Sequence, residues 1–181
     1  VIPNKQAELD NFASTLISSM NAIHSRGTSF PAQNSLSSEV EGIAATTTDL
    51  YADPTLGALD SASFNISVVN KATGAVVTTT LAAGGGAGPI TLPTGGTFSL
   101  DDLDTLIEAN GDVAGDLTVT TGVDSSGNAY INIAATDSNN AIVLSNASGD
   151  VLGLLQPNKF FSGSDAGDIA VKDTIVANPG T

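Results

Sequence analysis

A stretch near the middle of the chain, Thr97–Gly111, constrains the fold more than any other part of the sequence. It predicts a short helix, because Ser99 is a favourable N-cap and Asp102 completes a capping-box pattern three residues later. Asn110-Gly111 predicts a left-handed stop at the end of this helix. Its apolar positions recur at helical spacing, at Leu100, Leu103, Leu106 and Ile107.

On both sides of this helix the sequence changes to segments rich in Val, Ile and Thr with the two-residue period of strands. A single amphipathic helix between two hairpins is expected to lie across the sheet that those hairpins build. The sequence therefore predicts an α+β fold with a mostly antiparallel sheet and one short helix packed on it.

The charge balance excludes several classes of function. The 181 residues include 19 acidic and five basic side chains, for a net charge of −14 at pH 7. A surface this acidic repels phosphate backbones and anionic headgroups, so we expect no nucleic acid and no membrane as partner. The absence of cysteine excludes disulfides, thiol catalysis and thiolate metal sites. Because the first residue is Val rather than Met, we expect the sequence to start inside a longer chain.

The longest helical pattern lies between Asn4 and Ser25. We call its candidate packing or subunit-interface residues the apolar stripe, which consists of Leu9, Phe12, Leu16, Met20 and Ile23. Such a stripe has to be covered, either by the same chain or by neighbouring subunits and helices outside this sequence. Because stripes of this kind are normally buried within a domain, the sequence favours cover from the same chain.

The segment that follows this helix has weaker patterns. Ser38–Ala45 predicts one or two helical turns, Asp53-Pro54 predicts a turn, and Leu56–Leu59 predicts another short turn.

Two hairpins are predicted by alternation and turn residues. The first joins Phe64–Val69 to Ala75–Leu81, with Phe64, Ile66 and Val68 on one face. The second joins Leu117–Val123 to Ala129–Ala134 across the turn Asp124–Asn128. Shorter elements are predicted at Ile90–Leu92, Ala141–Leu144, Val151–Leu155 and Ile169–Val171. We divide the chain into a helical stem segment and loop (1–62), a β-rich projecting module (63–155) and a return segment to the stem (156–181).

No combination of side chains predicts chemistry. His24 is the only histidine, and a structural role at a helix end is expected because no second ligand or base accompanies it. Capping and the helix dipole explain the acidic run Asp101–Glu108. The glycine-rich Gly84–Gly88 lacks the Lys-Ser/Thr of a phosphate-binding loop. We therefore expect no enzyme activity, no catalytic residues, no metal site and no cofactor.

Several segments resemble flagellar proteins. Residues 90–155 are similar to the IN motif of flagellar axial proteins, with a Ser-Leu-Asp-Asp-Leu helix start at Ser99–Leu103 and a strand at Ala129–Ile133. Leu9–Gly27, which ends in Asn-Ala-Ile-His-Ser-Arg-Gly, and Phe160–Val171, with its Phe-Phe and Asp-Ile-x-Val pattern, resemble the flagellar hook-associated protein 1 family. These proteins form the hook–filament junction.

The resemblance implies a structural adaptor of the bacterial flagellum, located extracellularly at the hook–filament junction. It implies packing against copies of itself in a ring, the hook protein and the second junction protein, whereas this chain alone is expected to be monomeric. The terminal helices that drive polymerisation in the family have no counterpart among the matching segments. Filament cap proteins and some flagellins share the IN motif, so both remain alternatives. A further alternative is an extracellular adhesin-like binding module, which should be complete by itself.

Overall fold

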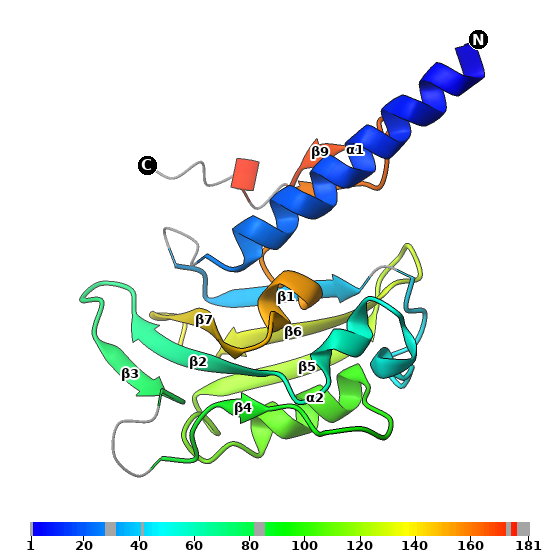
Figure 1. The fold of residues 1–181 in the computed structure, drawn as a ribbon. Coiled ribbons are helices and arrows are strands. Elements are labelled where there is room, and N and C mark those ends of the chain that lie inside the picture. The colour runs from blue at the N-terminus through cyan, green and yellow to red at the C-terminus, as the bar shows by residue number, and fades with distance from the viewer. Residues whose placement is uncertain (1, 28–31, 41, 82–85, 173–174, 177–181) are drawn as a thin grey trace.

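The computed structural model describes residues 2–27, 32–40, 42–81, 86–172 and 175–176. A long helix, α1 (Ile2–Ser25), projects from a β-rich body (Figure 1). The body contains the helices α2 (Leu100–Glu108) and α3 (Val151–Leu155) and the short 3₁₀ turns at Leu50–Ala52 and Leu56–Leu59. Its strands are β1 (Ser35–Val40), β2 (Ser63–Asn70), β3 (Val76–Thr79), β4 (Ile90–Thr91), β5 (Leu117–Val123), β6 (Ala129–Ala135) and β7 (Asn140–Ser148). The mixed α+β class expected from the sequence is confirmed.

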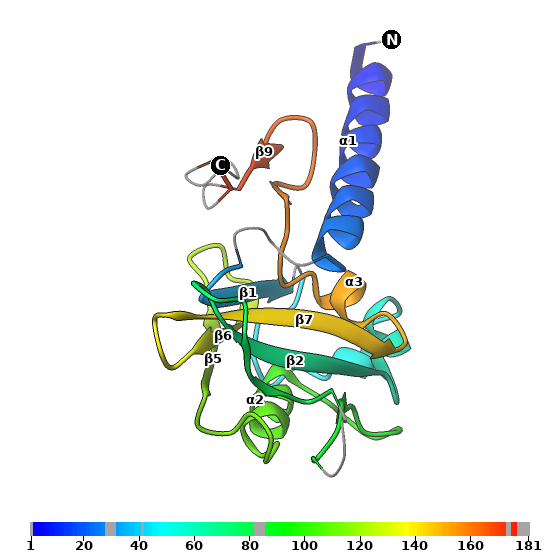
Figure 2. The same cartoon turned by 90° about the vertical axis from the view of Figure 1, so that its left-hand side faces the viewer.

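The predicted hairpins both form, but they belong to two different sheets. The strands β5 and β6 pair antiparallel, and β1 pairs with the other side of β6. The second sheet has β2 at its centre, with β7 on one side and β3 and β4 on the other. The expectation that both hairpins build a single sheet is therefore wrong. Figure 2 shows the two sheets within one body.

The helix α2 forms where the sequence predicts it. The side chain of Ser99 accepts a hydrogen bond from the Asp102 backbone amide, and the Asp102 carboxylate accepts one from the Ser99 amide, which completes the capping box. The helix packs against β5 and β6 and buries Leu100, Leu103 and Ile107.

The end of α2 differs from the prediction. Its C-cap is Ala109 in the right-handed region, and neither Asn110 nor Gly111 adopts a positive φ. The Asn110 carbonyl instead accepts hydrogen bonds from the amides of Val113 and Ala114, which continues the chain in tight turns. The backbone needs a positive φ only later, at Gly115.

A single hydrophobic core joins the two sheets and α2. It contains apolar side chains from β1, β2, β5, β6, β7, α2 and α3. In β2, Phe64, Ile66 and Val68 are buried, as their alternation predicts. Because β7 runs as far as Ser148, it is longer than the predicted strand Ala141–Leu144 and pairs with the whole of β2.

The described residues of the segment Ser38–Ala45 form no helix, so this prediction is wrong. Residues 35–40 form β1, which pairs antiparallel with β6 from Ser35 opposite Ala134 to Val40 opposite Ala129. Leu36, Ser38 and Val40 point inward and are buried. Buried and less buried side chains alternate along these six residues, as they do in a strand. Pairing with β6, far along the chain, stabilises this strand over local helical turns. The division of the chain at residues 62 and 155 stays a prediction, and β1 adds a strand from the first part to the sheet of the second.

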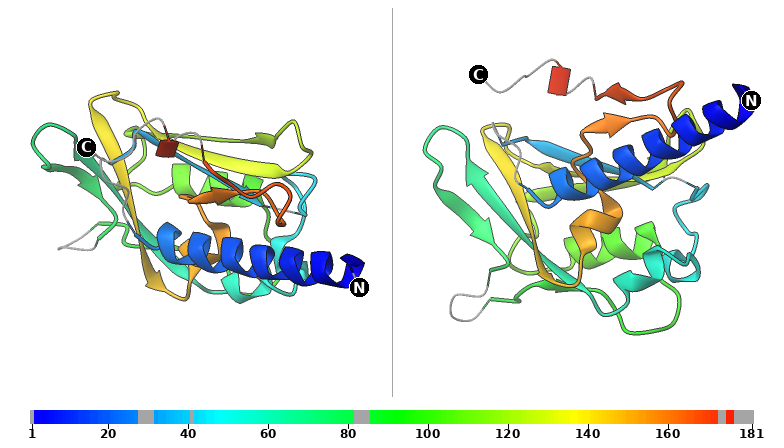
Figure 3. Two further views of the ribbon diagram at one scale, coloured as in Figure 1. Left: turned by 90° about the horizontal axis from the view of Figure 1, so that it is seen from above. Right: turned by 45° about the horizontal axis from the view of Figure 1, so that its top comes forward.

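A short ribbon follows the body and lies beside α1 in Figures 1 and 3. It consists of β8 (Phe161–Ser162) and β9 (Ala170–Val171), which pair antiparallel, so a strand predicted at 169–171 is confirmed. We call α1 together with this ribbon the stem. None of the helices in the described part of the chain is long and apolar enough to cross a membrane.

Candidate interaction surface

One side of α1 packs onto the body and the ribbon. Its buried residues are spaced by four, at Ala13, Ile17, Asn21 and Ser25. This side of the helix contacts α3 and β8. A spacing of four places these side chains in one row along the helix, so the contact covers only one face.

Asn21 connects α1 to the ribbon. Its side-chain oxygen accepts hydrogen bonds from the backbone amides of Phe160 (2.9 Å) and Phe161 (2.7 Å). Its side-chain nitrogen donates to the Phe161 carbonyl at 2.9 Å. The residue is only 2% exposed. A buried amide that completes three bonds to one backbone segment positions that segment, because its polar groups would otherwise be buried without partners.

His24 in the last turn of α1 and Arg26 just after it make further bonds to the return segment and to the body. Nδ1 of His24 lies 2.7 Å from the Asn158 carbonyl, and its ring packs edge-on to Phe160. Nε of Arg26 donates to Asp150 at 2.9 Å, and a second guanidinium nitrogen contacts the other carboxylate oxygen. The structural role expected for His24 at a helix end agrees with these contacts.

Asp150 joins the stem to α3. Besides binding Arg26, its carboxylate accepts hydrogen bonds from the Gly153 amide and from the Asn146 side chain. The hydrogen bond from Arg26 is the main reason why the pKa of Asp150 lies below its ordinary value. The Asp150 carboxylate thus caps the N-terminus of α3 and also binds Arg26, which follows the end of α1.

The apolar stripe lies next to this buried row on α1 and is exposed. Its five side chains are between 38% and 65% exposed, from Leu16 at the lower to Phe12 at the upper value. The expectation that the same chain covers the stripe is therefore wrong for the described residues. Ala13, Ile17 and Asn21 form the row that meets α3 and β8, and this row lies beside the stripe. The role of the stripe as a packing or subunit interface stays a prediction.

The first turns of α1 extend beyond the body (Figures 1 and 2). The first buried side chain of the helix is Ala13, and residues 3–9 are all exposed. Short helices without tertiary packing are only marginally stable in water. The exposed apolar side chains Leu9 and Phe12 lie on this extending part, which makes it the strongest candidate for contact with another molecule.

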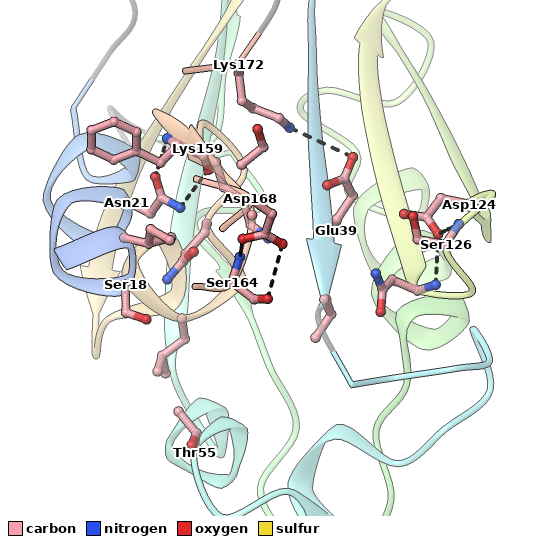
Figure 4. A pocket seen from close by; sticks show the side chains of 18 of the residues that line it. Ser18, Asn21, Glu39, Thr55, Asp124, Ser126, Lys159, Ser164, Asp168 and Lys172 are labelled. Atoms are coloured by element: carbon pink, nitrogen blue, oxygen red, sulfur yellow. Dashed lines mark hydrogen bonds and ion pairs between the residues drawn. The ribbon is translucent and has the colours of Figure 1, made fainter. Parts of the chain in front are cut away.

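A polar groove of about 560 Å³ separates the stem from β1 and the 3₁₀ turns. Figure 4 shows Lys172 above Glu39, and the ammonium nitrogen of Lys172 is 3.8 Å from a carboxylate oxygen of Glu39. It also shows Asp168, which accepts hydrogen bonds from Ser164. The carboxylate of Asp168 accepts backbone hydrogen bonds from Asp165 and Ser164, and these hold its pKa below the ordinary value. These polar groups close the loop of the ribbon and tie it to β1, so their contacts are structural.

Asp101, in the first turn of α2, also has structural partners. Asp101 accepts hydrogen bonds from the hydroxyl groups of Thr46 and Thr121. Partial burial, with the nearby Glu108 and Asp101, raises the pKa of Asp104. Among the described residues, no group of three or more His, Cys, Asp or Glu side chains could hold a metal ion.

Two predicted loops are stabilised by aspartates. In the turn between β5 and β6, Asp124 accepts hydrogen bonds from the amides of Ser126 and Asn128, as expected of a hairpin turn. In the glycine-rich segment, Gly84 and Gly85 lie outside the described residues, and the Gly88 amide donates to Asp112.

Sequence reasoning missed the residues that hold the stem together. Asn21 is a polar residue in a row with Ala13 and Ile17, and this was the only local signal of its burial. The pairs Asn21–Phe161 and Arg26–Asp150 join residues more than a hundred positions apart, for which one sequence contains no signal.

Comparison with known proteins adds little to this description. No protein-family model matches the chain, and no match was found among curated proteins. A solved structure that matches is that of the D2–D3 domains of the flagellar cap protein from Serratia marcescens. The sequence identity is 16% and the TM-score 0.40, and the match covers 67% of this chain and 54% of the cap-protein chain. A likeness at this level carries no functional argument.

Proposed function

We propose that this chain is a structural, non-enzymatic part of a flagellar axial protein, and more specifically of the hook–filament junction protein. The observation that carries the proposal is the contact between the two segments that resemble this family. Asn21 in the first segment binds the backbone of Phe160 and Phe161 in the second. Two segments with the same family resemblance thus form one structural unit, the stem, although about 140 positions separate them.

The proposed mechanism is packing. The stem fixes the direction of α1 relative to the body, and the apolar stripe then contacts neighbouring axial subunits. The partners proposed are copies of the same protein in a ring, the hook protein and the second junction protein. The β-rich body lies at one end of α1 (Figure 1), and the acidic composition of the chain suits an extracellular location.

The alternative of an adhesin-like binding module predicts a different stem. A binding module that is complete by itself should bury its apolar helix face. Leu9, Phe12 and Ile23 are each more than half exposed, which supports a role in assembly over an independent binding module.

The location of the protein tests the proposal. Antibodies raised against this chain are used for immunogold electron microscopy of intact cells of the source organism. Label in a narrow band between hook and filament is expected. Label at the distal tip would assign the chain to a cap protein, and label along the filament to a flagellin. Label over the cell body alone would contradict any flagellar role.

The apolar stripe is tested with a matched pair of variants in the full-length protein. Phe12→Lys is expected to abolish incorporation into the junction, because it puts a charge into an apolar contact. Asn11→Lys adds the same charge at the neighbouring exposed position, outside the stripe, and should assemble normally. Equal incorporation of both variants would exclude the stripe as the assembly surface.

A further inference from the structure

The acidic residues of this chain are unevenly distributed. Of its 19 acidic side chains, none lies between Asp60 and Asp101, and Lys71 is the single charged residue in that interval. The interval supplies β2, β3 and β4. One region of a protein with a net charge of −14 is therefore almost free of charge.

This region without acidic residues includes the outer strand of a sheet. The strand β3 pairs with β2, and on its other side no strand of the described residues follows. Figure 1 shows β3 at the margin of the body, away from α1. Three large apolar side chains are exposed here: Val76 at 58%, Val77 at 47% and Leu81 at 54%. We call these three residues the neutral edge.

The neutral edge itself has no charged side chain, and the nearest charged residue in the sequence, Lys71, is turned toward another loop. Lys71, in the turn before β3, donates a hydrogen bond to the Ser138 carbonyl and so points to the adjacent loop. Within β3, the hydroxyl of Thr79 pairs with that of Ser67 on β2 at 2.7 Å. Natural proteins usually protect an outer strand with charged side chains, and this strand has none.

We propose that the neutral edge is a contact site for a second copy of this chain, with the two β3 strands side by side and antiparallel. Such a contact is isologous, because the same residues meet from both copies. Two copies that each carry a charge of −14 repel one another over most orientations. The neutral edge lets them approach with apolar side chains and the outer backbone groups of β3 in contact, where neither strand contributes an acidic side chain.

The contact is weak by its dimensions. A strand of four residues buries less area than a stable dimer interface needs. The register shift in the pairing of β2 and β3 also interrupts the regular ladder beside Val69. We therefore expect self-association only at high protein concentration.

The dependence on salt distinguishes this contact from one made by ion pairs. Raising the salt concentration screens the repulsion between two acidic chains over a Debye length of about 3 Å at 1 M. Association through the neutral edge should therefore become stronger in salt, by about threefold or more in the association constant. A contact held by ion pairs would become weaker.

The experiment is analytical ultracentrifugation of the chain at low and high salt, together with NMR of the valine and leucine methyl groups. Salt-enhanced association is expected, with concentration-dependent shifts at Val76, Val77 and Leu81. Val77→Asp should abolish it, and Val123→Asp, which adds the same charge to the half-exposed Val123 of β5, should not. Circular dichroism checks folding, and Leu81→Asp replaces Val77→Asp if that variant is unfolded.

Three results would overturn the proposal. They are a monomer at every concentration and salt level, equal loss of association in Val123→Asp, and association that survives Val77→Asp but is lost in Phe12→Lys. The last result would assign the contact to the apolar stripe. The proposal depends on the charge distribution and not on the flagellar assignment, so the immunogold result leaves it unaffected.

Discussion

The side-chain amide of Asn21 donates a hydrogen bond to the carbonyl of Phe161, 140 positions later in the chain. The same side chain accepts from the amides of Phe160 and Phe161. A single buried residue thus satisfies three backbone groups of the return segment. It determines where the ribbon lies against α1, and with it the arrangement of the stem.

Asn21→Ala should release the ribbon from α1. The substitution leaves three backbone groups without partners, at a cost of about 1–3 kcal/mol for each one that stays buried. We expect faster hydrogen exchange at the amides of residues 160–171 and little change in the β-rich body. Asn11→Ala, at an exposed position of the same helix, is the control. Unchanged exchange in the ribbon of Asn21→Ala would contradict the role given to this residue.

Ser99→Ala should lower the stability of the whole body, because α2 packs on the common core. Loss of an N-cap typically costs about 1 kcal/mol of folding stability. Urea denaturation of the variant measures this loss. Ser99 and Asp102 bond to each other in both directions, so their effects should not add. The double variant Ser99→Ala/Asp102→Ala is expected to be less destabilised than the sum of the single variants. Simple additivity would show that the two side chains act independently.

Asp104→Asn should stabilise the protein at neutral pH. Burial raises the pKa of Asp104 in the folded state, and the neighbouring Glu108 and Asp101 add to this effect. A raised folded-state pKa means that the ionised carboxylate costs stability at pH 7, and that this cost disappears once the pH falls below about 3.9, the ordinary value for aspartate. The advantage of the variant should therefore be present at pH 7 and shrink as the pH falls.

Urea denaturation at several pH values measures the effect of Asp104→Asn. Asp102→Asn is the matched control, because the Asp102 carboxylate accepts from the Ser99 amide and its loss should destabilise the protein at pH 7. A destabilised Asp104→Asn variant at pH 7 would mean that the Asp104 carboxylate has a favourable partner.

Gly163→Ala should disrupt the ribbon. Gly163 has a φ of 92°, and a Cβ built there would overlap the carbonyl of Asp168 across the loop. Gly127→Ala is the control that separates backbone strain from steric overlap. Gly127 has a φ of 85°, but no atom lies within 4 Å of the added carbon. The control should lose about 1 kcal/mol from the left-handed backbone alone. Gly163→Ala should also lose the NMR signature of the pairing between β8 and β9, and retention of that pairing would refute the prediction.

The sequence by itself determined the elements whose cause lies within a few residues. The capping box of Ser99 and Asp102 specifies the start of α2 through neighbouring side chains. The alternation of Phe64, Ile66 and Val68 and the turn at Asp124–Asn128 likewise act locally, and these elements formed as predicted. The acidic composition and the absence of acidic residues from 61 to 100 can also be read without coordinates.

Only the tertiary structure decided the features that depend on distant partners. Residues 35–40 became a strand because β6, almost a hundred positions later, supplies its hydrogen-bond partners. The two hairpins entered separate sheets because β2 pairs with β7 and β6 pairs with β1. Which side of α1 is buried depends on where α3 and β8 contact it. The periodic pattern of apolar residues in α1 does not predict where those contacts fall. Local sequence specifies the backbone conformation of a segment, whereas burial depends on which distant segments come to cover it.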